Sequence, residues 1–158
     1  IFNERVNDGI KNYAKFSQVD EISRLSSIGY RMTFQLNSLE IIKKHPFIGV
    51  GTGDFPQEYK KVNMVNTPGM ANATNPHNMY ILITTQLGIL GLISFFSIFY
   101  FQFKIAFRST NILVRNVGFA LPVMFLVIML SDSYLLGHFT TLLFIFFSSF
   151  LYRDFENV

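Results

Sequence analysis

Cysteine and tryptophan are absent from the 158 residues, and charged residues are few, at 15%. Without cysteine, the chain has no disulfide framework, no thiolate metal site and no cysteine nucleophile. A charged fraction well below the about 25% of a typical globular protein excludes a disordered chain, a coiled coil and a highly charged nucleic-acid binder. The net charge of +3 is small and scattered, so we expect no nucleic-acid partner.

Apolar residues are abundant, because half of the chain is hydrophobic and 19 residues are phenylalanine. The charges gather in residues 1–78, which hold nine of the 13 Lys and Arg and seven of the ten Asp and Glu. The sequence begins at Ile1 and has no signal peptide. We therefore expect a fragment of a larger, multi-span protein.

Three apolar runs follow residue 78 and predict transmembrane helices at about 79–103, 112–131 and 134–152. The first run has no charge from Met79 to Phe103 and would be roughly 37 Å long as a helix, against roughly 30 Å of hydrocarbon core. The second run is the shortest, and a buried helix of a soluble protein is its alternative. Three runs in succession predict an all-α integral membrane protein.

Basic residues predict the orientation of these runs. They lie between the first and second runs and after the third: Lys104, Arg108, Arg115 and Arg153. The positive-inside rule then places the first connection and the tail 153–158 in the cytoplasm. Residues 1–78 and the short Ser131–Ser133 turn, which carries Asp132 and no basic residue, are expected on the extracytoplasmic side.

Residues from about 20 to 44 have the periodicity of an amphipathic helix. Apolar side chains recur there at spacings of three and four: Ile28, Met32, Leu36, Leu39 and Ile42. Lys43 and Lys44 suit the last turn, and Pro46 marks the end. Arg24 and Arg31 would lie about 20° apart on the flank of the apolar stripe. They are either two solvated arginines or a pair of cations for a polyanionic group.

Three glycines alternate in the next segment, at Gly49, Gly51 and Gly53, and predict a tight loop with close backbone approach. Their spacing matches neither a dinucleotide fingerprint nor a P-loop. Residues 56–74 are polar and rich in turn formers, which is typical of a surface loop.

The segment Asn75-Pro76-His77-Asn78 directly precedes the first apolar run. Asn75 is predicted as the N-cap and Pro76 as the first helical residue, which would place His77 in the first turn. Free backbone N–H groups at such a helix end would suit a phosphate. The same positive field would keep His77 neutral and able to accept a proton. The alternative is an interfacial histidine at a helix start.

Two further features lie in the apolar runs. Gly88 and Gly91 are spaced for close packing of helices. His138 is an ionisable residue in the third run and so a functional candidate, with a packed histidine as the alternative. No carboxylate dyad or clustered His, Asp and Glu predicts a metal site.

The ordered combination of these motifs resembles the O-antigen ligase and polymerase family of bacterial inner-membrane glycosyltransferases. The elements in order are Arg31, His-Pro-Phe-Ile-Gly-Val-Gly-Thr-Gly-Asp-Phe at 45–55, Pro-His-Asn-Met-Tyr at 76–80 and Gln-Leu-Gly-Ile-Leu-Gly-Leu at 86–92. The similarity extends over roughly residues 24–130. The family often has a tryptophan shortly after the arginine, where this chain has Phe34-Gln35.

The resemblance implies the C-terminal portion of a multi-pass inner-membrane enzyme with no metal and no cofactor. Its family transfers a glycan from an undecaprenyl-diphosphate carrier to an acceptor hydroxyl on the periplasmic side, on lipid A core or on a growing glycan.

By position, Arg31 matches the arginine thought to hold the diphosphate, and His77 matches the histidine of the His-Asn motif. Arg24 is a candidate second cation, and Asn78, Gly51 and Gly53 are further candidates for contact with the diphosphate or glycan. Ligase and polymerase remain open, and the alternatives to glycan transfer are a membrane transporter and a non-catalytic membrane scaffold.

Overall fold

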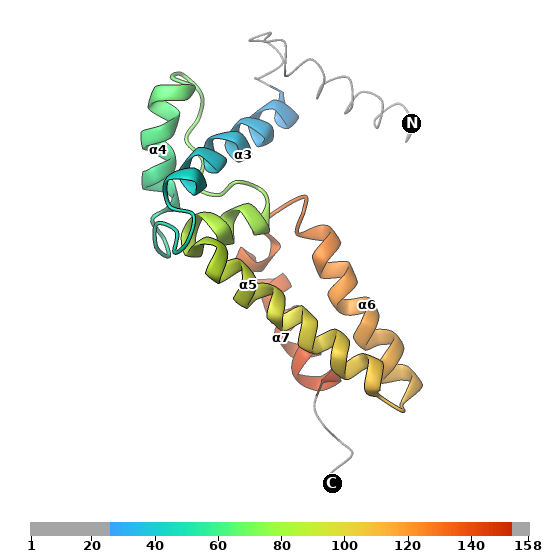
Figure 1. The fold of residues 1–158 in the computed structure, drawn as a ribbon. Helices are drawn as coiled ribbons and strands as arrows, with labels where there is room; N and C mark the ends of the chain where they lie inside the picture. The colour runs from blue at the N-terminus through green and yellow to red at the C-terminus, as the bar shows by residue number, and fades with distance from the viewer. Residues whose placement is uncertain (1–25, 153–158) are drawn as a thin grey trace.

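Helices make up all the regular structure of residues 26–152, the part of the chain that the computed structural model describes (Figure 1). In chain order they are α3 (Ser27–Lys44), α4 (Phe55–Asn66), α5 (Met79–Arg108), α6 (Ile112–Ile128), the short 3-10 helix η1 (Tyr134–Leu136) and α7 (His138–Leu151). The predicted all-α class is confirmed for these residues. The predicted helix start at residue 20, Arg24 and the tail 153–158 lie outside them.

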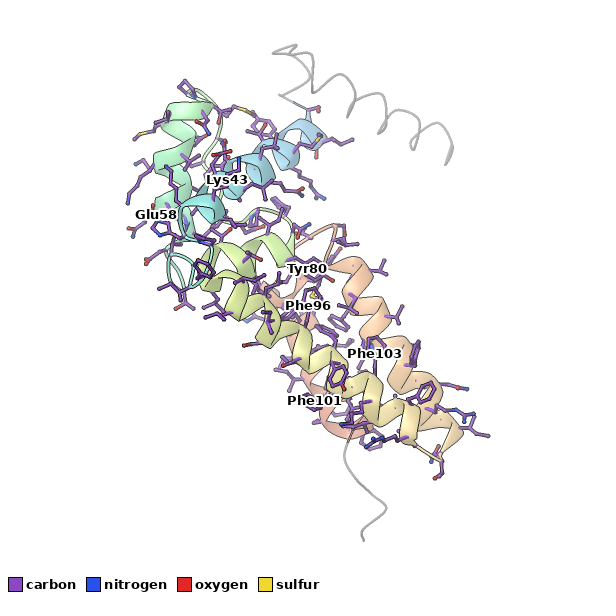
Figure 2. All side chains as sticks on the ribbon, in the orientation of Figure 1. Lys43, Glu58, Tyr80, Phe96, Phe101 and Phe103 are labelled. Atoms are coloured by element: carbon purple, nitrogen blue, oxygen red, sulfur yellow. The ribbon has the colours of Figure 1, made fainter. Side chains whose placement is uncertain are left out.

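Helix α5 reverses direction at Gly88, whose φ of 66° and ψ of −166° are not helical. The rings of Tyr80 and Phe96 stack with their centroids 5.5 Å apart (Figure 2). In a straight helix, sixteen residues would separate them by about 24 Å. Residues 79–103 therefore do not form one straight helix, and the straight part of α5 runs from Ile89 to Arg108.

The loop after α3 supplies the backbone groups that this break requires. A break in a helix leaves carbonyl groups on one side and N–H groups on the other without helical partners. Four hydrogen bonds to the loop replace them: Val50 N to Thr85 O at 3.0 Å, Gly51 N to Gln86 O at 2.9 Å, Ile89 N to Pro46 O at 2.9 Å and Leu90 N to Phe47 O at 3.3 Å. The two halves of α5 are thus both tied to the same loop.

Two glycines make this close approach possible. A Cβ atom at Gly49 would lie 2.4 Å from the carbonyl carbon of Gln86, and one at Gly88 would lie 2.1 Å from the Phe47 oxygen. The predicted close approach is confirmed at Gly49. The prediction that Gly88 and Gly91 allow helices to pack together is wrong, because Gly88 meets the loop and Gly91 faces Leu87 of its own helix.

Helix α4 occupies part of the segment that the sequence predicts as a loop. Phe55, Tyr59 and Val62 recur at helical spacing and are all buried. Pro56 sits at the start of the helix, where its missing N–H is not needed. The sequence prediction missed this helix because residues 56–74 are rich in turn formers and its apolar face has only three residues.

Helix α3 ends at Lys44 with both lysines in its last turn, as predicted, but its buried face is not the predicted one. Ile28, Leu36 and Leu39 are 46%, 49% and 41% exposed. The buried residues are instead mostly small or polar: Gly29, Thr33, Asn37, Ser38 and Ile41. This face is turned inward because α4 pairs with it through hydrogen bonds.

Asn37 is the centre of that polar contact between α3 and α4. Its Nδ2 donates to the Tyr59 hydroxyl at 3.2 Å and to Thr67 Oγ1 at 2.8 Å. Burial raises the pKa of Tyr59, while the hydrogen bond with Asn37 acts in the opposite direction. A neutral phenol at this position accepts from Asn37 and fixes α3 over α4.

Asn78, rather than the predicted Asn75, is the N-cap of α5. Its Oδ1 accepts from Tyr80 N at 3.0 Å and Ile81 N at 3.1 Å, and its Nδ2 donates to Leu130 O at 3.1 Å. Asn75 Oδ1 instead accepts from His77 N at 2.8 Å in a turn before the helix. His77 therefore precedes the helix, with a φ of 50°.

The straight part of α5 packs with α6 and α7, and all three expose large apolar side chains. Among the described residues, α5 is the one helix that is long and apolar enough to cross a membrane, while α6 and α7 are apolar but shorter. The third predicted run is divided at Gly137 into η1 and α7. His138 is the exposed first residue of α7, so it lies at a helix end rather than inside a run.

We predict that Gly88→Ala destabilises the protein more than Gly53→Ala does. Both glycines have positive φ, at 66° and 90°, which disfavours a side chain at either position, and the φ and ψ of Gly88 (66° and −166°) are essentially restricted to glycine. A Cβ at Gly88 would also overlap the loop backbone, whereas nothing lies within 4 Å of one at Gly53. We expect a further loss of about 2 kcal/mol or more for Gly88→Ala, measured by thermal unfolding in detergent. Equal losses would contradict this packing of loop and helix.

We also predict that Asn78→Ala costs more stability than Asn111→Ala. Asn111 caps α6 in the same way, through Leu113 N and Val114 N, and in residues 26–152 its side chain makes no bond to another helix. Removing a cap costs about 1 kcal/mol, and losing the bond to Leu130 adds about 1 kcal/mol. Unfolding of the two variants under one set of conditions measures the difference, and its absence would show that the Leu130 bond adds nothing.

Candidate functional site

The four consecutive residues that follow α6 contact donor groups of α3 and of the segment at the start of α5. In order along the turn, Met129 O accepts from Met79 N at 3.0 Å, Leu130 O from Asn78 Nδ2 at 3.1 Å and Ser131 O from Arg31 Nη1 at 3.2 Å, while Asp132 Oδ1 lies 3.0 Å from His77 Nδ1. Neighbouring Cα atoms are about 3.8 Å apart. The turn 129–132 therefore brings Arg31 and His77, far apart in sequence, to one place.

The His77 ring lies between an aromatic face and a carboxylate. It stacks on Phe34, with ring centroids 6.1 Å apart and planes inclined by 20°. The side chains of His77 and Asp132 are 31% and 34% exposed, so the pair is partly open to solvent. Phe34 is the aromatic residue that follows Arg31 on α3, so the same helix supplies a cation and a support for the imidazole.

The start of α5 does not offer the free N–H groups that the sequence predicts around His77. Met79 N, Tyr80 N and Ile81 N all donate to acceptors within the protein. An anion at this site would depend on Arg31, which is exposed and uses one of its five N–H donors in a hydrogen bond within residues 26–152. The positive charge of the site is thus a side chain rather than a helix end.

Asp132 is the site residue that sequence reasoning missed as a partner of His77. It served there only to orient the connection between two apolar runs. It is also the only Asp or Glu between Glu58 and Asp154. A single carboxylate among apolar runs is itself a sign of function, and could have identified it.

The other predicted site residues lie elsewhere or are already engaged. Gly51 and Gly53 belong to the loop that meets α5 at Thr85–Gly88, about two helical turns from Asn78. Both atoms of the Asn78 amide bond within the protein. In residues 26–152, no three His, Asp or Glu side chains gather where they could share a metal ion.

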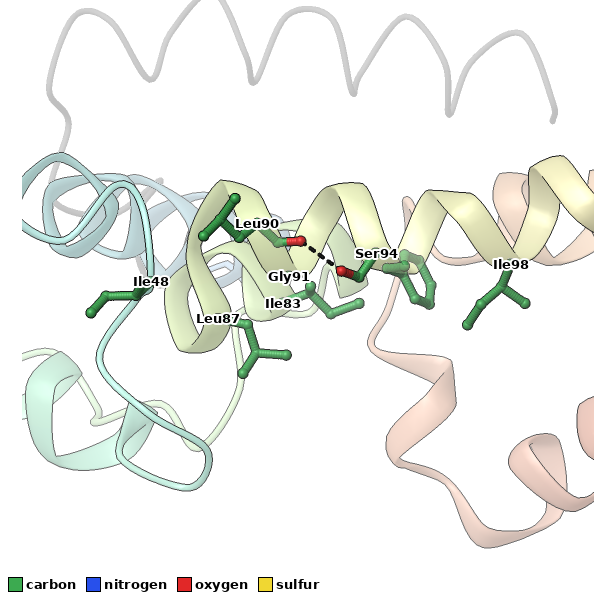
Figure 3. A pocket seen from close by; sticks show the side chains of 8 residues that line it. Ile48, Ile83, Leu87, Leu90, Gly91, Ser94 and Ile98 are labelled. Carbon is green, nitrogen blue, oxygen red and sulfur yellow. Dashed lines mark hydrogen bonds between the residues drawn. The ribbon is translucent and has the colours of Figure 1, made fainter.

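An apolar hollow of about 520 Å³ opens beside the break in α5 (Figure 3). Ile48 of the loop lines it together with side chains of both halves of α5, from Ile83 to Ile98. Its one hydroxyl, on Ser94, already donates to Leu90 O at 2.9 Å. None of the predicted site residues lines this hollow.

The chain was compared with models of known protein families. The O-antigen ligase family matches residues 5–96, more than half of the chain. The match includes α3, α4, the glycine loop and the His77–Asn78 segment, and it ends before α6 and the turn 129–132. A comparison with individually curated proteins finds no match.

The family is one of membrane enzymes of the glycosyltransferase type, whose substrates are glycans and lipid-linked molecules. The resemblance based on Arg31, the glycine loop and the Pro-His-Asn segment is confirmed by a match over all three. This chain belongs to the O-antigen ligase family.

Proposed function

We propose that this protein transfers a glycan from an undecaprenyl-diphosphate carrier to an acceptor hydroxyl at the periplasmic face of the bacterial inner membrane, as a ligase or a polymerase. The observation that carries the proposal is the turn 129–132, where Arg31 and His77 are held by the adjacent residues Ser131 and Asp132. A cation for the leaving diphosphate and a base for the acceptor are the two groups that such a transfer needs.

In the proposed step, His77 Nε2 accepts the proton of the acceptor hydroxyl as its oxygen attacks the anomeric carbon. The bond between that carbon and the diphosphate oxygen breaks, and its electron pair leaves with the lipid diphosphate. Arg31 neutralises the charge that grows on this leaving group, using donors that Ser131 does not occupy. The proton passes from His77 to water afterwards, which restores the base.

Direct displacement of this kind inverts the anomeric configuration and needs no covalent intermediate. Neither residue has to act as a nucleophile, since the diphosphate is a competent leaving group once its charge is neutralised. A glycosyl-enzyme trapped during turnover would contradict this mechanism.

The arrangement of charge supports a membrane orientation with the site on the periplasmic side. The straight part of α5 is roughly 30 Å long, which equals the hydrocarbon core. Lys104, Arg108 and Arg115 are all exposed near the α5–α6 connection, whereas Asp132 follows the other end of α6. The positive-inside rule assigns the basic end to the cytoplasm.

In this proposal the straight half of α5, with α6 and α7, crosses the membrane, and residues 1–78 are periplasmic. The exposed apolar side chains of these helices suit contact with lipid or with further helices. The first half of α5 folds back beside the outer part of this span, because Tyr80 stacks on Phe96, which lies about 10 Å along the span from Ile89. His77 then lies beside the periplasmic end of the span. A polyprenyl carrier presents its diphosphate at that depth.

We predict that His77→Ala lowers glycan transfer about 10²–10⁴-fold, the usual contribution of a general base. His45→Ala is the matched control, because His45 is exposed and closes α3 through its backbone N–H, which alanine keeps. The measurement is a gel of surface polysaccharide from cells that carry each full-length variant, at equal protein level, beside an assay of lipid-linked glycan. Unchanged transfer in His77→Ala would exclude His77 as the base.

The pattern of loss also separates the remaining alternatives. Absence of all glycan from the acceptor, with accumulation of lipid-linked chains, identifies a ligase, and loss of long chains with retention of single-unit products identifies a polymerase. A transporter or scaffold predicts normal glycan in both His77→Ala and Arg31→Ala. We expect Arg31→Lys to remain impaired, because lysine keeps the charge but loses the planar donor fork of arginine.

A further inference from the structure

We propose that the end of α5 opposite the candidate site binds the headgroup of an anionic phospholipid through Lys104 and Arg108. The proposal goes beyond glycan transfer and takes from the proposed function only its membrane orientation, which places this end of α5 at the cytoplasmic leaflet. Both residues lie beyond residue 96, where the family match ends.

Lys104 and Arg108 project from a face of α5 that the other helices leave uncovered. The covered face meets α6 at Ala106, which is fully buried and whose Cβ would lie 3.3 Å from a Cβ at Gly118. At 100° per residue, both cations lie about 160° around the helix from Ala106 and about 40° from each other. Both are exposed. Because they are one turn apart on one face, they are spaced to bind the same phosphate group.

No carboxylate forms an ion pair with these cations in the part of the chain that the structure describes. Glu40 and Glu58 pair with lysines of their own helices, and Asp132 lies at the other end of α6. Arg115, near the start of α6, is exposed and adds a third cation at the same end of the molecule. Cations gathered in this way attract anions, and the anions at a cytoplasmic membrane surface are the headgroups of acidic phospholipids.

The depth of the two cations along the span matches the position of a headgroup. Lys104 and Arg108 lie about 23 Å and about 29 Å from Ile89 along the helix axis, against roughly 30 Å of hydrocarbon core. The long stems of lysine and arginine carry their charges from this depth to the membrane surface. Tyr100 lies one turn before Lys104, is more than half exposed, and is of a type that is enriched at the same boundary.

The same face of α5 offers apolar surface to the acyl chains of a lipid. Leu90, Ile93 and Phe101 are each more than half exposed, and lie within about 40° of the direction midway between the two cations. The Phe101 ring centroid lies 6.0 Å from Lys104 Nζ, so the apolar and charged parts of the face are in contact. A phospholipid with a negative headgroup matches both parts, whereas a free phosphate ion matches only the charged one.

The test uses the full-length protein in neutral detergent, freed of bound lipid and titrated with short-chain phosphatidylglycerol, with thermal unfolding as the measure of binding. Phosphatidylglycerol should raise the melting temperature, and phosphatidylcholine with the same chains should raise it far less. Lys104→Gln/Arg108→Gln should weaken the apparent Kd for phosphatidylglycerol about 10–30-fold, or roughly fivefold for each cation removed. Lys44→Gln/Lys60→Gln is the matched control and should bind as wild type, because it removes the same charge from exposed lysines of α3 and α4 that form no ion pair in residues 26–152.

Salt and single variants sharpen this test. Binding should weaken in 1 M salt, where the Debye length is about 3 Å, and Lys104→Arg should bind as wild type. Lys104→Gln alone should still lose about fivefold, which keeps the proposal testable where the double variant unfolds. Equal binding by wild type and Lys104→Gln would overturn the proposal. Equal stabilisation by phosphatidylcholine or by inorganic phosphate would also overturn it, because a chain or an anion alone would then suffice.

Cysteine labelling separates this proposal from the proposed function. The 158 residues contain no cysteine, so Thr110→Cys adds one thiol at the α5–α6 connection, with the unsubstituted protein as the background. A membrane-impermeant maleimide should label it in inverted inner-membrane vesicles and not from the periplasmic side. Labelling from the periplasmic side would overturn the orientation in the proposed function. Cytoplasmic labelling together with unchanged lipid binding in Lys104→Gln would overturn the lipid site alone.

Discussion

The exchange of backbone hydrogen bonds between the loop 46–51 and the break at Gly88 is the constraint on which the site depends. A straight α5 would carry Met79 about 15 Å away from Ile89 along the axis, beyond the end of α6. The reversal folds the first half back, so that the capped start of α5 lies against the turn 129–132. The loop N–H groups of Val50 and Gly51 donate to carbonyl groups before the break, and the N–H groups of Ile89 and Leu90 after the break donate to carbonyl groups of the loop. These bonds allow the reversal without leaving backbone groups unpaired. The glycines of the loop therefore serve the site from a distance.

The turn 129–132 meets a second requirement of the backbone. The carbonyl groups at the C-terminal end of a helix lack helical partners and carry partial negative charge. Here donors from two other segments take successive carbonyls just beyond α6: Met79 N, the Asn78 amide and the Arg31 guanidinium. A cation at a helix C-terminus is electrostatically favourable. The donors that bind these carbonyl groups beyond α6 thus include Arg31, and they hold the segment that carries His77, so the residues of the proposed chemistry lie together at this helix end.

Sequence patterns predicted the helical class, the end of α3 at Lys44, the close approach at Gly49 and the family of the chain. They failed where a pairing between distant segments decided the outcome. The apolar stripe of α3 faces outward because Asn37 bonds with Tyr59 and Thr67, contacts that no local periodicity contains. Asn75 and Asn78 are both good caps by type, and the bond from Asn78 to Leu130 favours the second of them. The uncharged run from Met79 to Phe103 does not indicate a reversal, because the reversal is stabilised by hydrogen bonds to residues 46–51, which lie outside the run.

The division of the site between the two parts of the chain explains why one member of it escaped motif reasoning. The family match contains Arg31, Phe34 and His77, and it ends at residue 96. Their partners Ser131 and Asp132 come from a turn between apolar helices, where a recognisable motif is not needed because a carbonyl at Ser131 would serve with any side chain. Asp132 contacts His77 through its side chain, whereas Arg31 is bound by the Ser131 carbonyl, which a substitution of the Ser131 side chain leaves in place. The turn between two apolar helices therefore holds both Arg31 and His77 in position.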